Sequence, residues 1–155
     1  MHQAESRQSR HVNRGSEIEN RTSNTFTHTI PESPNGFRAG PFDHERLEAF
    51  QVARQALARG DHIARGLPRG FGSLKDQLRR ALLSAYLGVA EAANRTGKDR
   101  LARFRWARAE AAEAAAALDA ILILKLATAG EIHEVIHLLA RLAAMLTKLG
   151  RLNNT

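Results

Sequence analysis

Residues 73–95 form one predicted helix that is apolar on two opposite sides, and this feature constrains the fold more than any other. With a period of 3.6 residues, one side fits a hydrophobic core and consists of Leu78, Ala81, Leu82, Ala85, Val89 and Ala92. The other side consists of Leu83, Tyr86, Leu87 and Ala90. A small bundle buries only one side of such a helix, so the second side predicts contact with another subunit.

Three further segments have the helical period, and each is predicted to be a helix. They are 43–65, 98–128 and 131–149. Asp43 is the predicted N-cap of the first. Residues 120–127 are apolar all round except for Lys125, so we expect them to be buried on most sides. Because the connections are short, an antiparallel up-down-up-down four-helix bundle over 43–151 is the predicted fold, of the all-α class.

Residues 1–42 differ in composition from the rest of the chain. They are rich in Ser, Thr, Asn, Arg and His, and their apolar residues follow no helical or strand period. Such a segment cannot bury enough apolar surface to offset the loss of chain entropy on folding. We therefore predict a disordered tail over 1–42 and a folded part over 43–151.

Composition narrows the classes of function. The chain has no Cys, which excludes thiolate nucleophiles, disulfides and Cys-based zinc sites. It has neither a run of 18 apolar residues nor an apolar signal core at its N-terminus, so we expect a cytoplasmic protein without a membrane span. Residues 43–155 hold eighteen Lys and Arg against twelve Asp and Glu. This surplus of positive charge favours a polyanionic partner.

A basic cluster surrounds the turn between the second and third predicted helices. Its members are Arg79, Arg80, Arg95, Lys98, Arg100, Arg103, Arg105 and Arg108, together with Trp106. Cations at helical spacing can follow phosphate groups, and a Trp that lies off the core face beside Arg can stack on a base. The alternatives are ion pairs at a subunit interface, or a solvated face balanced by Asp99, Glu110 and Glu113. We interpret the cluster as a surface that binds RNA or DNA.

Five apolar side chains exceed what the predicted core needs. They are Leu83, Tyr86, Leu87, Ile123 and Leu124. Ordinary core packing is the alternative, above all for Ile123 and Leu124. We interpret the five as an oligomer interface and therefore predict a homo-oligomer.

The sequence His133-Glu134-Val-Ile-His137 matches the H-E-x-x-H pattern of zinc peptidases. In that pattern both His bind Zn²⁺ and the Glu is the general base. No Asp, Glu or His follows as a third ligand, and all three residues lie opposite the apolar side of 131–149. We therefore expect a solvated or interface face, with no catalytic residue, metal or cofactor. Adventitious metal binding by His133 and His137 is the alternative.

Three blocks of sequence resemble a known family. They are Leu47-Glu-Ala-Phe-Gln-Val-Ala; Gln77-Leu-Arg-Arg-Ala-Leu-Leu-Ser84 with Val89-Ala-Glu91; and Arg103-Phe-Arg-Trp-Ala-Arg with Glu113. In this order and spacing they resemble the bacterial four-helix-bundle proteins encoded in 23S rRNA intervening sequences. The accessory variability proteins of diversity-generating retroelements are similar. The resemblance spans roughly 43–151. It implies a ring-like homo-oligomer, often a pentamer, with a basic surface suited to nucleic acid.

These patterns together predict a non-catalytic, homo-oligomeric helical bundle that binds RNA or DNA. The resemblance adds a ribonucleoprotein or a reverse transcriptase as a further partner. Two alternatives stay open: a protein–protein assembly module without a nucleic-acid role, and a weak metal-dependent hydrolase that uses the His-Glu-x-x-His stretch.

Overall fold

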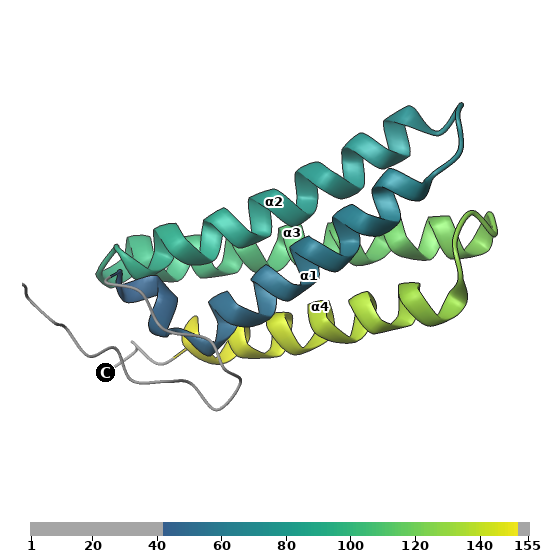
Figure 1. Cartoon of the computed structure of the whole chain (residues 1–155). Helices are drawn as coiled ribbons and strands as arrows, with labels where there is room; N and C mark the ends of the chain where they lie inside the picture. Colours follow the sequence, from purple (N-terminus) through teal and green to yellow (C-terminus); the bar gives the residue numbers. More distant parts are fainter. Residues whose placement is uncertain (1–41, 152–155) are drawn as a thin grey trace, which may run out of the picture.

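The computed structural model describes residues 42–151, and all regular elements in this range are helical (Figure 1). A short 3-10 turn, η1 (Asp43–Arg46), precedes four α-helices. They are α1 (Glu48–Gly66), α2 (Gly72–Ala93), α3 (Gly97–Ile123) and α4 (Ala129–Leu149). Neighbouring helices run antiparallel, and α4 packs against α1 to close the bundle. The predicted four-helix bundle is confirmed. Residues 1–41, nearly all of the predicted disordered tail, lie outside the described residues, as do 152–155.

The core-facing side of α2 is buried as predicted, and alanine lines much of the core. Leu78, Val89 and Ala92 are fully buried, and α3 meets them with Phe104, Ala107, Ala111 and Ala114. Small residues let the two helices approach closely. A Cβ atom added at Gly88 of α2 would lie 2.9 Å from the Cβ of Ala107. The α2–α3 contact is therefore too tight for a larger residue at this position.

The first helix begins later than the sequence predicts, so the expected helix over 43–65 with Asp43 as its N-cap is wrong. Leu47 is extended, with φ −78° and ψ 124°, and separates η1 from α1. Local bonds hold this arrangement. The Glu45 carboxylate accepts from the Phe42 N–H at 3.1 Å, and the Glu45 carbonyl accepts from Gln51 Nε2 at 2.8 Å. The extended Leu47 interrupts the helical hydrogen bonds, and the Gln51 side chain supplies the Glu45 carbonyl with a partner in their place.

The third helix ends at Ile123 and not at 128, because Lys125 takes the left-handed conformation with φ 55°. The Lys125 N–H donates to the Leu122 carbonyl, and the Leu126 N–H donates to the Ile121 carbonyl, both at 3.0 Å. This pair of bonds is the Schellman ending of a helix. Glycine usually occupies that left-handed position, so the lysine gives no sign of a helix end.

Because α3 ends early, the prediction that residues 120–127 are buried on most sides is wrong. Ile121 is fully buried, whereas Ile123 is 70% exposed and Leu124 is 51% exposed. Ile123 is the last residue of α3, and Leu124 is the first residue of the turn to α4. At the other end of this turn, the Thr128 hydroxyl accepts from the Glu131 N–H and caps α4.

Within residues 42–151, no helix combines the length and the apolar character that crossing a bilayer requires.

Candidate nucleic-acid interface

The cations predicted to form one surface lie on two sides of α3. Arg95 and Arg103 are on the side facing α2, where both approach Glu91. Arg105 and Arg108 line a groove against α4. The predicted cluster is therefore divided by the body of α3, and each half has its own electrostatic environment.

The half that faces α2 is balanced by acid. Arg103 forms an ion pair with Glu91, and Arg95 lies 3.9 Å from the same carboxylate. The Arg103 guanidinium also lies 4.2 Å from the centre of the Trp106 ring, in a cation–π contact. Trp106 is 38% exposed, and its ring packs beside Gly88. A base stacking on the ring from the Arg103 side would have to displace the guanidinium.

Arg79 and Arg80 lie toward the opposite end of α2, away from this turn. Fourteen residues of helix separate Arg79 from the end of α2 at Ala93, roughly 21 Å along the axis. Both arginines are paired within the chain. Arg79 lies 2.8 Å from Asp61 of α1, and Arg80 lies 2.8 Å from Glu113 of α3. The structure therefore does not bring them together with the cations at the α2–α3 turn.

The half that faces α4 contains no acid. A groove of about 250 Å³ is lined by Arg105, Arg108, Leu146, Thr147, Gly150 and Arg151. We call it the arginine groove. Within residues 42–151, none of its three arginines forms an ion pair with a carboxylate. The carbonyl groups at the end of α4 supply only partial negative charge. Three guanidinium groups in one groove are thus available to an anion.

Arg151 is absent from the residues predicted for this surface. Its place follows from the antiparallel packing of α3 and α4, which sets the end of α4 beside Arg105 and Arg108. The sequence could have indicated the position of Arg151. Gly150 marks the end of the last helix, and in an antiparallel bundle that end lies beside the beginning of α3. Lys98 and Arg100 lie on the first turn of α3. Neither forms an ion pair within the described part of the chain, and Arg100 lies 5.4 Å from the Phe104 ring.

A second groove lies between α1 and α2, with a volume of about 700 Å³. We call it the α1–α2 groove. Its lining residues are Arg54, Leu57, Ala58, Asp61, Asp76, Arg79, Arg80, Leu83 and Tyr86. On the second apolar side of α2, Leu83 and Leu87 are 47% and 46% exposed, whereas Tyr86 and Ala90 pack against the core. Tyr86 is half-buried, because its ring packs on Phe50 with the centres 4.7 Å apart. That these side chains form a subunit interface stays a prediction.

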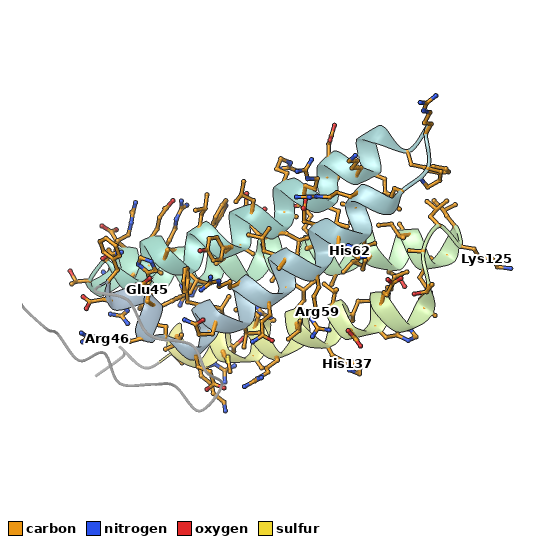
Figure 2. All side chains as sticks on the ribbon, in the orientation of Figure 1. Glu45, Arg46, Arg59, His62, Lys125 and His137 are labelled. Carbon is orange, nitrogen blue, oxygen red and sulfur yellow. The ribbon has the colours of Figure 1, made fainter. Side chains whose placement is uncertain are left out.

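The histidines of the H-E-x-x-H pattern lie on the outer face of α4. His133 and His137 are exposed, and Figure 2 shows His137 directed away from the bundle. Glu134 forms an ion pair with Arg59 of α1. Among residues 42–151, no three His, Asp or Glu side chains lie close enough together to hold a metal ion. The Glu134 carboxylate is therefore paired with an arginine. It does not belong to a group of side chains in this range that could bind a metal ion.

Comparison with models of known protein families and with curated proteins finds no match. What the chain binds must therefore be inferred from its own side chains. These offer two separate features: an arginine groove without acid on one side of α3, and exposed apolar side chains on α2 and at the α3–α4 turn.

Proposed function

We propose that the chain is a non-catalytic, homo-oligomeric basic bundle that binds RNA or DNA through the arginine groove. The observation that carries this proposal is the meeting of Arg105, Arg108 and Arg151 without a carboxylate partner in the described residues. Guanidinium groups bind phosphate oxygens in pairs of charge-assisted hydrogen bonds. The overall surplus of seven positive charges adds a long-range attraction for polyanions.

The first turn of α3 extends this surface. Lys98 and Arg105 are seven residues apart, so they project from the same side of the helix, about 10 Å from one another. Both are exposed. A nucleic-acid backbone that follows α3 can therefore contact Lys98 before it reaches the arginine groove.

The resemblance to the proteins of 23S rRNA intervening sequences agrees with this proposal. It suggests a ring of subunits, with five as the working number, that acts beside a ribonucleoprotein or a reverse transcriptase. Leu83 and Leu87 support self-association independently of the resemblance, because about half of each side chain stays exposed within residues 42–151.

A protein–protein assembly module is the rival proposal, and one observation favours it. Arg79, Arg80, Arg95 and Arg103 are each paired with an acid of the same chain. A neutralised arginine contributes little to counterion release on binding a polyanion. If the arginine groove serves only protein contacts, the chain assembles without affinity for nucleic acid.

Binding of labelled single-stranded RNA and DNA, measured by fluorescence anisotropy over a salt series, separates the two proposals. For the wild type we expect the logarithm of the binding constant to fall linearly with the logarithm of salt concentration. The double variant Arg105→Gln/Arg108→Gln should lower the magnitude of that slope by about two, because each lost phosphate contact removes about one unit.

The matched control is Arg59→Gln/Arg141→Gln. It removes the same charge from the α1–α4 side, where the two arginines pair with Glu134 and Glu48. We expect this variant to keep nearly the whole slope. Absence of salt-dependent binding by the wild type, or an equal loss in the control, would contradict the assignment of the arginine groove.

A further inference from the structure

We infer that the α3–α4 turn of one subunit inserts into the α1–α2 groove of the next, so that the oligomer is built head to tail. This inference rests on the self-association proposed above and adds which two surfaces meet. The occupant of the groove is thus a second copy of this chain, and its contacting side chains are Ile123 and Leu124. We call these two residues the apolar knob.

The apolar knob is exposed and held in a fixed shape. Ile123 is the most exposed large hydrophobic residue in 42–151, at 70%, and Leu124 beside it is 51% exposed. The two hydrogen bonds of the Schellman ending fix the backbone that carries both side chains. Leu126 anchors the turn by packing against the core. A preorganised projection of this kind loses little conformational entropy when it is buried.

The α1–α2 groove is large enough for the apolar knob and is partly apolar. Leu57, Ala58, Leu83 and Tyr86 give it an apolar surface between two helices. Its volume of about 700 Å³ lies within the range of pockets that enclose small ligands, so two aliphatic side chains fit. Leu83, which is 47% exposed in the single chain, becomes buried in this arrangement.

One pair of opposite charges, Lys125 and Asp76, supports a second copy as the occupant. Lys125 follows the apolar knob directly and projects beyond the end of the bundle (Figure 2). Asp76 lines the α1–α2 groove and is exposed. Neither residue forms an ion pair within 42–151, whereas Asp61 in the same groove is taken by Arg65 and Arg79. Three arginines also line the groove, Arg54, Arg79 and Arg80, and the last two are paired with Asp61 and Glu113. The partner for Lys125 is therefore the single carboxylate of Asp76, and not the charge of the groove as a whole.

The positions of the two surfaces suit a closed ring. The α1–α2 turn and the α3–α4 turn lie at the same end of the bundle, on different helix pairs (Figure 1). Parallel subunits placed side by side can therefore set the knob of each beside the groove of its neighbour. Such a contact joins two different patches, and it generates a ring when the rotation between neighbours closes and an open filament when it does not.

Two variants that each lack one surface test the inference. Ile123→Asp/Leu124→Asp removes the knob and keeps the groove, and Leu83→Asp does the reverse. All three positions are exposed, so circular dichroism should show unchanged helicity. By sedimentation velocity, each variant alone should be monomeric, with its self-association weakened by about two orders of magnitude. An equimolar mixture should form a heterodimer and nothing larger, because only one intact knob and one intact groove can meet.

Further variants distinguish a failure of the head-to-tail contact from a failure of self-association as a whole. Ala116→Asp, on the exposed side of α3, should assemble as the wild type does. Lys125→Asp and Asp76→Lys should each weaken assembly, and the double exchange should restore it. Full assembly of the knob variant, or no heterodimer in the mixture, overturns the head-to-tail contact. A wild type that stays monomeric at every concentration defeats self-association as a whole and leaves nucleic-acid binding to its own salt series.

Discussion

Replacement of Gly88 by alanine should destabilise the bundle, although alanine is the better helix former. The added Cβ would lie 2.9 Å from the Cβ of Ala107 and 3.1 Å from the Trp106 ring. Overpacking of a tight contact costs about 1–3 kcal/mol, and the gain in helix propensity offsets about 1 kcal/mol of it. We therefore expect the free energy of unfolding to fall by about 1 kcal/mol for Gly88→Ala.

Urea unfolding followed by tryptophan fluorescence measures the free energy of unfolding with a probe that lies beside the substituted residue. Trp106 is the only tryptophan of the chain, and its ring is one of the two groups that must move. Its emission in the folded variant should therefore shift toward that of exposed tryptophan.

The control is Gly130→Ala in the first turn of α4, where an added Cβ meets nothing within 4 Å. The same chemical change should there raise the free energy of unfolding by about 0.5 kcal/mol. If Gly88→Ala proves as stabilising as Gly130→Ala, the close approach of α2 and α3 at Gly88 is refuted.

Two further substitutions test how the α3–α4 turn is built. Lys125→Gly should raise the free energy of unfolding by about 0.5 kcal/mol, because relief of the left-handed backbone outweighs the added entropy of the unfolded chain; a loss of stability in thermal unfolding would contradict this. Thr128→Ala should lower the free energy of unfolding by about 1 kcal/mol through loss of the N-cap bond to the Glu131 N–H. Thr96→Ala should leave stability nearly unchanged, because that N-cap residue makes no side-chain capping bond, and equal losses in the two variants would argue against capping by Thr128.

Much of the fold can be read from the sequence because it depends on local periodicity. The 3.6-residue period identifies both apolar sides of α2, and the structure buries the side with Leu78 while it leaves Leu83 exposed. The ends of helices are harder to predict, because they depend on single backbone conformations. Lys125 adopts a conformation that usually belongs to glycine, so the sequence predicts that the third helix continues past Ile123.

The candidate site is less predictable, because its electrostatics depend on residues that are distant in the sequence. Arg79 and Arg80 appear as free cations in the sequence, yet Asp61 and Glu113 neutralise them through contacts between helices. Arg151 joins the arginine groove for the same reason, since only the packing of α4 on α3 places it there. The period of a helix gives its buried side, but not which charges on other helices lie opposite.

Mapping of ultraviolet cross-links between the full chain and RNA by mass spectrometry shows whether RNA lies in the arginine groove. We predict adducts on peptides from both walls of this groove: the part of α3 around Arg105 and Arg108, and the end of α4 near Arg151. Two outcomes would contradict it. One is adducts confined to the contact between α2 and α3, around Glu91 and Arg103. The other is an absence of adducts under conditions in which a known RNA-binding protein cross-links.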